Sequence, residues 1–425
     1  MGENKIVMEK IKNCRACENK DLALVLDLGS TPLANSIISE EQLDETEFVA
    51  PLEVLVCQSC ALAQISCTIP PEQLFRNYAY FSSFSETMLK HARELCLRLN
   101  AERQLNKDSF VLEIASGDGY LLKNYNELQV PALGVEPARN VAEVARKCGV
   151  ETVSEFFDGD LAKKIVDMKG QADIIHAHNV MAHVPNINSM LQGLRTVLKD
   201  TGVAVIEVPY AVKMVERLEF DTIYHEHVFY FSVTALNNLF KRNGLILADV
   251  EQIEIHGGSL RLFVSKADKQ SSTVLALLDE EDARGFGSKE GYETFAKRVN
   301  NLKSDLVDLI KKLKKDNKKL AVYGASAKGS TLLNFCQLGR QYFDFAVDRS
   351  TAKQGYYMPG VKLPIYDPIE LVKQKPDYVL LLTWNFAPEI LKQQEEYIRL
   401  GGQFIVPIPK PQIVTSCAEP ASVYV

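Results

Sequence analysis

Residues 110–122 read FVLEIASGDGYLL, and this stretch decides the fold. FVLEI is apolar except for Glu113, which is typical of a buried strand, and a turn with two glycines follows before a helix begins. A second short strand, ALGVEPA at residues 132–138, contains Glu136 about twenty residues after the turn. Glycines in such a turn let backbone N–H groups approach a ligand, and an acid that closes the next strand can bind two ribose hydroxyls. The pattern therefore predicts a Rossmann-like nucleotide site.

The same geometry serves a dinucleotide or S-adenosylmethionine (SAM), and the details favour SAM. The turn reads EIASGDG and not GxGxxG, and it resembles motif I of class I SAM-dependent methyltransferases. Residues 172–184, ADIIHAHNVMAHV, resemble the fourth strand of that fold with its loop, and residues 202–210, GVAVIEVPY, resemble the fifth. A strand–turn–helix that binds nothing is the alternative. The residues that the resemblance assigns to the cofactor are Glu113, Gly117, Asp118, Gly119, Glu136 (the ribose-binding acid) and Asn179.

Four cysteines near the N-terminus form two CxxC pairs, Cys14 with Cys17 and Cys57 with Cys60. A CxxC turn presents two thiolates to one metal, and two such turns complete the tetrahedral four-sulfur shell that holds structural zinc. The alternative is two redox or free-thiol pairs, but no thioredoxin-like βαβ pattern accompanies either one. Because four cysteines leave no open position, the zinc is predicted to be structural and not catalytic.

Composition bounds the class of protein. A chain of 425 residues with 46% hydrophobic and 24% charged residues indicates two or three folded domains. The net charge of −7 argues against a nucleic-acid partner. No signal-peptide pattern begins the sequence and no apolar run has the length of a membrane span, so we expect a cytoplasmic protein without a membrane partner. We expect a monomer or a weak oligomer.

Residues 77–88, NYAYFSSFSETM, concentrate aromatic and hydroxyl side chains ahead of the Gly turn. One interpretation is a hydrophobic lid over the next domain, and the other is a set of hydroxyls that line a ligand pocket. The composition does not decide between them. On the second interpretation, Tyr78 and Ser83 contact the cofactor.

A second strand, Gly turn and helix follow at residues 318–336, and FAVDRS at residues 345–350 supplies a further strand ending at Asp348. This predicts a second Rossmann-like domain. A Gly turn and an acid at this spacing suit NAD, so an NAD-dependent nucleotide-sugar oxidoreductase is the alternative function. The turn GASAKG instead favours a phosphate or pyrophosphate, bound by Ser326, Lys328 and the helix N-terminus. Further predicted substrate contacts are Asn334, Lys353, Tyr356 and Trp384, the last with packing as an equal alternative.

The order of motifs along the whole chain resembles one family. Two CxxC pairs, YAYFSS, LEIASGDG, NVMAHV, YHEHVFYFS, HGGSLRLFV and VYGASAKGSTLLN occur together, and this resembles the deoxysugar C-methyltransferases, in particular the sugar C-3′-methyltransferases. The resemblance implies SAM-dependent methyl transfer to C3 of a nucleotide-linked 4-keto-6-deoxyhexose, with dTDP as the common nucleotide. The active-site residues that it assigns are Tyr80, His183, Tyr224, Glu226 and His227.

The resemblance also implies three domains. A zinc-binding module is expected at residues 1–76, and a class I SAM-methyltransferase Rossmann-like domain at residues 77–268. A C-terminal Rossmann-like domain at residues 269–425 would help to bind the nucleotide-sugar and carry no redox cofactor of its own.

Methylation at carbon needs a base, because a C3 proton beside a C4 ketone must leave to give an enolate. Histidine suits this role, since its unperturbed pKa of about 6.5 lies near working pH. In a regular strand the side chains of YHEH, residues 224–227, would alternate between two sides, so the predicted trio would not converge. We therefore predict a loop, with His227 as the base and Glu226 fixing its tautomer or contacting the sugar. Tyr224, Tyr80 and His183 are the candidate donors to the enolate.

Other interpretations of these histidines stay open. His225 and His227 form an HxH pair that could bind a metal with a third ligand such as Asp221, or the stretch could be an ordinary buried strand. On the catalytic interpretation, His225 is a structural neighbour. His256, in EIHGGSLRLFV at residues 254–264, either faces the substrate or belongs to a structural hairpin. A protein that binds a nucleotide-sugar without turnover is the remaining alternative function.

Overall fold

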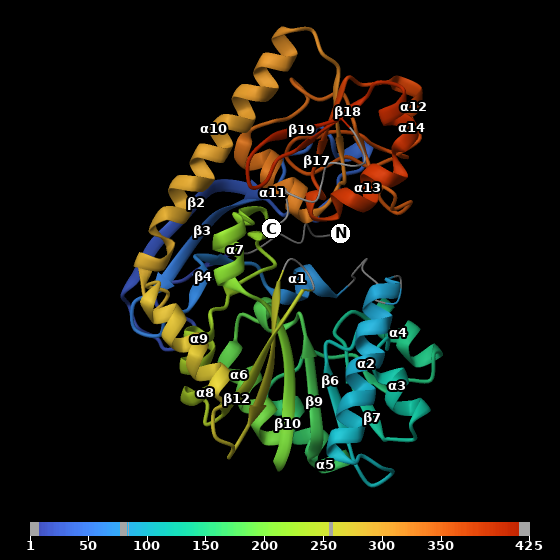
Figure 1. Ribbon diagram of the computed structural model, residues 1–425. Helices are drawn as coiled ribbons and strands as arrows, with labels where there is room; N and C mark the ends of the chain where they lie inside the picture. The colour runs from blue at the N-terminus through green and yellow to red at the C-terminus, as the bar shows by residue number, and fades with distance from the viewer. Residues whose placement is uncertain (1–7, 77–82, 84, 255–257, 416–425) are drawn as a thin grey trace.

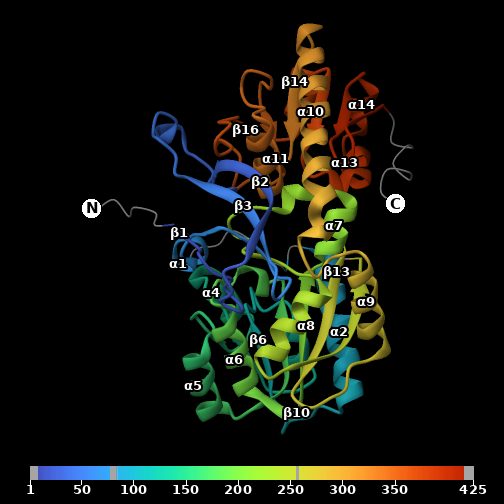
Figure 2. The ribbon, with the colours of Figure 1, turned by 90° about the vertical axis from the view of Figure 1, so that its left-hand side faces the viewer.

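The computed structural model describes residues 8–76, 83, 85–254 and 258–415. Two Rossmann-like bodies lie at opposite ends of the molecule, and the N-terminal sheet lies beside the junction between them (Figures 1 and 2). The long helix α10 (Glu293–Lys315) runs along one side of the molecule into the last body. This mixed α/β architecture is the predicted fold class. Within the described ranges, none of the helices combines the length and apolar character needed to cross a membrane.

The middle body is a seven-stranded sheet in the order β12-β13-β10-β9-β6-β7-β8. Its strands are β6 (Val111–Ile114), β7 (Ala132–Val135), β8 (Thr152–Val153), β9 (Ala172–His178), β10 (Leu198–Pro209), β12 (Ile246–Ile253) and β13 (Ser259–Ser265). The strands from β6 to β10 pair in parallel, whereas β13 is antiparallel to both β10 and β12. The strands predicted around the first Gly turn are confirmed, and β6, which carries Glu113, lies inside the sheet.

Helices cover both faces of this sheet, as the apolar strands require. Val111 and Val205 pack with α2 (Glu86–Arg103) and α3 (Leu122–Glu127) on one face. Their neighbours Leu112 and Ile206 pack on the other face, in the core that includes α5 (Gly159–Lys169), α6 (Ile187–Val197) and α8 (Val233–Arg242). Adjacent strand residues point to opposite faces, so near-continuous apolar strands indicate a sheet buried on both sides.

The last body is a six-stranded sheet in the order β16-β15-β14-β17-β18-β19. Its strands are β14 (Leu320–Tyr323), β15 (Ala346–Val347), β16 (Ile365–Tyr366), β17 (Tyr378–Leu381), β18 (Gln403–Val406) and β19 (Gln412–Val414), with only the last antiparallel to its neighbour. The chain turns after β14 into α11 (Ala327–Cys336). Strand order reverses between β14 and β17, and open α/β sheets bind ligands at such a point, beyond the carboxyl ends of the strands.

The N-terminal sheet includes a strand from elsewhere in the chain. It contains β2 (Leu22–Pro32), β3 (Val49–Cys57), β4 (Ala63–Ile65) and β11 (Phe229–Tyr230), in the order β11-β4-β3-β2. The β11 strand follows the YHEH stretch directly, and the amide of Ile65 donates to the Val228 carbonyl at 2.9 Å. The N-terminal module therefore holds one end of the predicted catalytic loop.

Candidate active site

The Gly turn after β6 brings the predicted cofactor residues together. Gly117 and Gly119 have φ of +55° and +81°, and Ala115 also has a positive φ of +56°. The Glu136 carboxylate accepts hydrogen bonds from the backbone N–H groups of Gly117, at 2.9 Å, and Ala138, at 2.8 Å. Left-handed backbone is costly for alanine and is concentrated at ligand sites. The turn is therefore fixed against the end of β7, with its acid at the position expected for a ribose.

Three buried carboxylates meet at this turn. Glu113 is 1% exposed, and neither of its carboxylate oxygens has a hydrogen-bond partner among the described residues. Burial raises the pKa of Glu113 well above its ordinary value, and the neighbouring Glu136 and Asp118 raise it further. Asp118 accepts a bond from the Ser83 backbone N–H at 3.1 Å, so Ser83 reaches the turn through its backbone. A cationic ligand would supply the missing partners, and SAM carries a sulfonium and an ammonium group, so these residues fit SAM.

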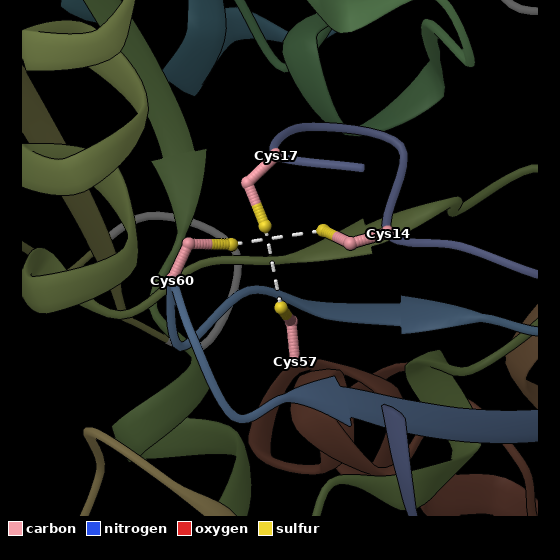
Figure 3. A group of neighbouring side chains, drawn as sticks. All are labelled: Cys14, Cys17, Cys57 and Cys60. Atoms are coloured by element: carbon pink, nitrogen blue, oxygen red, sulfur yellow. Dashed lines mark hydrogen bonds between the residues drawn. The ribbon is translucent and has the colours of Figure 1, made fainter. Parts of the chain in front are cut away.

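The four predicted zinc ligands converge on one point (Figure 3). All four sulfur atoms lie within 4.8 Å of one another, with Cys14 and Cys60 at 3.6 Å and Cys17 and Cys57 at 3.5 Å. A tetrahedral zinc with Zn–S bonds of about 2.3 Å places its sulfurs about 3.8 Å apart. The geometry fits a structural zinc ion. Among the described residues this is the one cluster of three or more metal-ligating side chains.

The YHEH residues form a turn, as predicted, between the 3₁₀ helix η4 (Phe220–Thr222) and β11. The Nδ1 atom of His227 lies 2.7 Å from the Thr222 carbonyl oxygen, and Nε2 lies 2.9 Å from the Tyr224 hydroxyl. A carbonyl only accepts hydrogen bonds, so Nδ1 carries the proton and Nε2 carries the lone pair. This is the tautomer that a base at Nε2 requires.

The structure corrects the predicted role of Glu226 in orienting His227. The partner of Nδ1 is the Thr222 carbonyl, while the Glu226 carboxylate accepts from the Asn35 side-chain amide at 2.6 Å. The HxH metal pair is also wrong, because Nε2 of His225 faces the Pro51 carbonyl at 3.2 Å, in the N-terminal sheet. His225 is the structural neighbour that the catalytic interpretation expects.

His183, in the loop after β9, lies next to His227. Their ring centroids are 4.9 Å apart, and Nδ1 of His183 lies 2.7 Å from the Glu226 carbonyl oxygen. Burial lowers the pKa of His183, so its imidazole is neutral near neutral pH. A neutral ring whose Nδ1–H donates to a carbonyl has only a lone pair at Nε2. In this tautomer His183 is an acceptor, which weighs against the predicted role as donor to an enolate.

One cavity of about 300 Å³ joins the two Rossmann-like bodies. Asn179, His183, Tyr224 and His227 line it from the middle body, and Ser326 and Lys328 line it from the last body. Sequence reasoning missed other lining residues, and Glu219, Tyr230 and Thr383 are among them. Three of the predicted catalytic residues, His183, Tyr224 and His227, therefore border the same space as the predicted phosphate-binding turn.

Lys328 and Ser326 occupy the start of α11 as predicted. The Ser326 hydroxyl accepts from the Gly329 N–H at 3.1 Å and caps the helix. The Lys328 ammonium lies 3.7 Å from the Glu219 carboxylate and 5.5 Å from the Trp384 ring centroid. Burial raises the pKa of Glu219 to about 7, with Lys328 opposing that effect.

Of four other predicted substrate contacts, three have partners within the protein and one is exposed. Lys353 donates to the Ala325 carbonyl at 2.8 Å, and the Asn334 amide donates to the Pro359 carbonyl at 3.1 Å. Tyr356 is 41% exposed on the surface. Trp384 is buried, and its indole donates to Asp221 at 2.7 Å, which favours the packing alternative. The same bond engages Asp221, the acid considered as a third metal ligand. Tyr78, Tyr80 and His256 lie outside the described residues.

A buried polar network under the site was not predicted. Glu207 near the end of β10 contacts His91 at 2.8 Å, His178 at 2.9 Å and Arg261 at 2.8 Å. Burial opposes ionisation of Glu207, but His178 and His91 outweigh it and hold its pKa below the ordinary value. One feature of the sequence could have indicated this network, the second HxH pair formed by His176 and His178. Side chains two residues apart in a strand point to the same side, and these two rings stack on each other.

Comparisons with known proteins identify the family of the chain. Residues 14–75 match a model of a zinc binding domain, residues 84–250 a methyltransferase domain, and residues 254–409 a C-methyltransferase C-terminal domain. C-methyltransferase NovU of Streptomyces niveus is 36% identical over 414 residues, which cover 96% of this chain and 98% of NovU.

Solved structures are more distant. A SAM-dependent methyltransferase from Clostridium acetobutylicum is 11% identical with a TM-score of 0.33, over 43% of this chain and 92% of that one. Magnesium protoporphyrin IX methyltransferase from Synechocystis, with bound SAH, is 12% identical with a TM-score of 0.33, over 42% and 83%. The family assignment rests on the full-length relative and on the domain models. The chain therefore belongs to the deoxysugar C-methyltransferase family that its motifs resemble, and it is a SAM-dependent methyltransferase with a zinc-binding N-terminal module.

Proposed function

We propose that the enzyme methylates C3 of a dTDP-linked 4-keto-deoxyhexose and that His227 removes the C3 proton. The observation that carries this proposal is the position of His227. Its Nε2 lone pair lies in a cavity bordered on one side by the methyltransferase loops and on the other by the Ser326–Lys328 turn. A substrate with a reactive sugar at one end and a diphosphate at the other matches this arrangement.

The chemistry explains why a base belongs between the two bodies. Carbon is not nucleophilic until a proton leaves, and a ketone at C4 makes the C3 proton acidic because the charge spreads into an enolate. SAM supplies an electrophilic methyl group when it is bound. The protein then has to hold C3 between the base and the methyl donor, and positioning of this kind accounts for much of the rate of such reactions.

The tautomer of His227 supports its assignment as the base. The Thr222 carbonyl fixes the proton on Nδ1, so Nε2 is free to accept a proton once the Tyr224 hydroxyl moves aside for the substrate. In this scheme Tyr224 holds the site ready and His227 takes the C3 proton.

The nucleotide end is expected at the turn before α11. The first N–H groups of this ten-residue helix and the Lys328 ammonium offer hydrogen bonds and positive charge to a diphosphate. The turn lies beside the point where strand order reverses in the last sheet, which is where open α/β sheets bind ligands.

Hydrogen exchange tests the base directly. The enzyme is incubated in D₂O with a dTDP-4-keto-deoxysugar, with SAH in place of SAM, and deuterium at C3 is measured. We expect exchange with the wild-type enzyme and with Tyr224→Phe, because that variant keeps the base. Exchange should be lost in His227→Gln.

His225→Gln is the matched control, because His225 is the adjacent histidine and its bond goes to the Pro51 carbonyl. It should exchange and methylate at close to the wild-type rate. Full methylation by His227→Gln would exclude His227 as the base, and loss of exchange in Tyr224→Phe would transfer that role to Tyr224.

A further inference from the structure

The hydroxyl of Tyr230 donates to no acceptor among the described residues, although the side chain lines the active-site cavity. Tyr230 is only 6% exposed. Buried polar groups in folded proteins almost always have a partner, so an exception calls for an explanation. A buried donor on a side chain that lines a ligand cavity is explained if the ligand supplies the acceptor.

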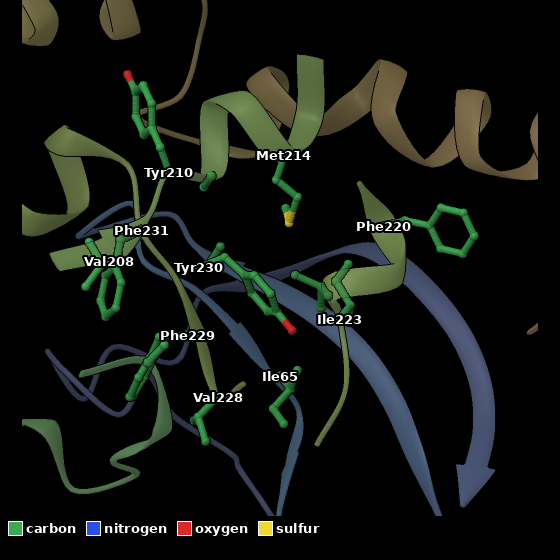
Figure 4. Close-up of a cluster of buried hydrophobic side chains, with 14 of the residues drawn as sticks. Ile65, Val208, Tyr210, Met214, Phe220, Ile223, Val228, Phe229, Tyr230 and Phe231 are labelled. Atoms are coloured by element: carbon green, nitrogen blue, oxygen red, sulfur yellow. The ribbon is translucent and has the colours of Figure 1, made fainter. Parts of the chain in front are cut away.

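Tyr230 is placed next to the catalytic loop by the N-terminal sheet. It lies in β11, paired with Ala63 of β4. Figure 4 shows its ring below Met214, with the hydroxyl directed toward the segment that carries Ile223. Burial raises the pKa of Tyr230 well above its ordinary value, and the backbone amide of Tyr224 offsets part of that effect. The phenol therefore keeps its proton, and it lies beside the residue whose hydroxyl contacts His227.

Two neighbouring donors at this end of the cavity already have partners in the free protein. The Tyr224 hydroxyl donates to His227 at 2.9 Å, and Nδ1 of His183 donates to the Glu226 carbonyl at 2.7 Å. Thr383 also has an unpartnered hydroxyl, but it packs beside Gly324 at the nucleotide-binding turn. Among the described lining residues, Tyr230 thus carries the buried hydroxyl that is left without an acceptor at the sugar end.

We propose that Tyr230 donates a hydrogen bond to the C4 oxygen of the sugar and stabilises the enolate formed there. This inference rests on the proposed function. As the C3–H bond breaks, its electron pair forms the C3–C4 double bond, the C4–O π electrons move to oxygen, and the proton passes to Nε2 of His227. A donor held at that oxygen in a dry site strengthens as the charge develops, and removal of such a donor costs about 100–1000-fold in rate.

Tyr230→Phe tests the proposal, because it removes only the oxygen. We expect kcat for methyl transfer and the rate of C3 exchange in D₂O to fall by about 100-fold, with KM for the sugar within about threefold of wild type. The midpoint of chemical unfolding should be unchanged or higher, because the variant removes a buried hydroxyl that has no partner in the free protein.

Tyr292→Phe is the matched control. The Tyr292 hydroxyl is also buried without a partner among the described residues, but the ring packs against Phe286 in the core, away from the cavity. This variant should leave kcat, KM and exchange unchanged. If the wild type is active and Tyr230→Phe is equally active, the proposed role of Tyr230 is wrong. The same conclusion follows if Tyr230→Phe loses activity only because it loses stability. A wild type that neither exchanges nor methylates the sugar would overturn the proposed function itself.

Discussion

The two Rossmann-like bodies tie their first turns to the sheet in the same way. In the middle body, the Glu136 carboxylate accepts from the N–H groups of Gly117 and Ala138. In the last body, the Asp348 carboxylate accepts from the N–H groups of Ala325 and Ser350, each at 2.8 Å. In each body, the acid at the end of the second strand thus hydrogen-bonds the turn that follows the first strand. The backbone architecture does not distinguish a SAM site from a diphosphate site.

The charge around each turn does distinguish them. Glu113, Asp118 and Glu136 surround the first turn with buried carboxylates, which suits a cation. Lys328 lies in the first turn of α11 and lines the cavity, which suits an anion. Fold alone does not set the ligand, because the site is built by side chains placed on it.

The largest expected effect on ligand binding that tests this difference between the two turns comes from Glu136→Ala. The substitution removes the acceptor of two backbone N–H groups and the expected ribose contact, and hydrogen bonds to charged groups are each worth about 1.5–3 kcal/mol. We therefore expect the Kd for SAM, measured by calorimetry, to rise about 100-fold.

The equivalent acid of the other body provides the control. Asp348→Ala should leave the Kd for SAM within about twofold of wild type, because its partners belong to the second turn. A similar loss of SAM affinity in both variants would show that the two turns are not separate sites.

A smaller effect is expected from Lys328→Met. The substitution removes a charge-assisted donor from the proposed diphosphate site, so the Kd for a dTDP-sugar should rise about 20-fold while SAM affinity is unchanged. Lys353→Met is the matched control, because that lysine donates to the Ala325 carbonyl within the protein. It should lower the free energy of unfolding by about 1 kcal/mol and change the Kd by less than about threefold. The reverse ranking of the two variants would place the diphosphate at Lys353.

Local sequence patterns predicted the first turn well. Gly117 and Glu136 act through backbone geometry that a short strand–turn–strand segment fixes by itself. The YHEH loop was also predictable, because alternation in a strand would have separated Tyr224 from His227. The zinc ligands form a shell because two CxxC turns meet only when the chain between them folds back.

Sequence reasoning failed where a contact depends on distant parts of the chain. Asn334 and Lys353 lie close to the second Gly turn in sequence, but their side chains support neighbouring loops. The Asn35–Glu226 bond joins residues 191 positions apart, and β11 pairs with a strand of the N-terminal module. No periodicity or motif spacing encodes such pairings, so the cavity and the exposure of Tyr230 to it required the structure.

The pH dependence of nucleotide-sugar binding tests the difference in charge between the two turns. Because the pKa of Glu219 is raised to about 7, this acid gains its charge as pH rises through that value. The ionised form pairs with Lys328 and adds negative charge where a diphosphate is expected, with Asp221 and Arg217 as the other charged neighbours. Binding should therefore weaken above neutral pH, by about fivefold between pH 6 and 8, and Glu219→Gln should flatten this dependence. A wild-type Kd that stays constant over this range would show that Glu219 does not face the diphosphate.

The smallest expected effect concerns what holds the catalytic loop between the two bodies. Asn35 of the N-terminal module donates to the Glu226 carboxylate at 2.6 Å, whereas Asn238 of the middle body donates to the Cys60 carbonyl, next to the zinc shell, at 3.3 Å. Both asparagines join the same two parts of the protein, but only Asn35 contacts the loop. Asn35→Ala should lower kcat by about threefold with KM unchanged, because β11 pairing still anchors the loop. Asn238→Ala should leave kcat unchanged, and an equal loss in both variants would mean that the module supports activity only through overall stability.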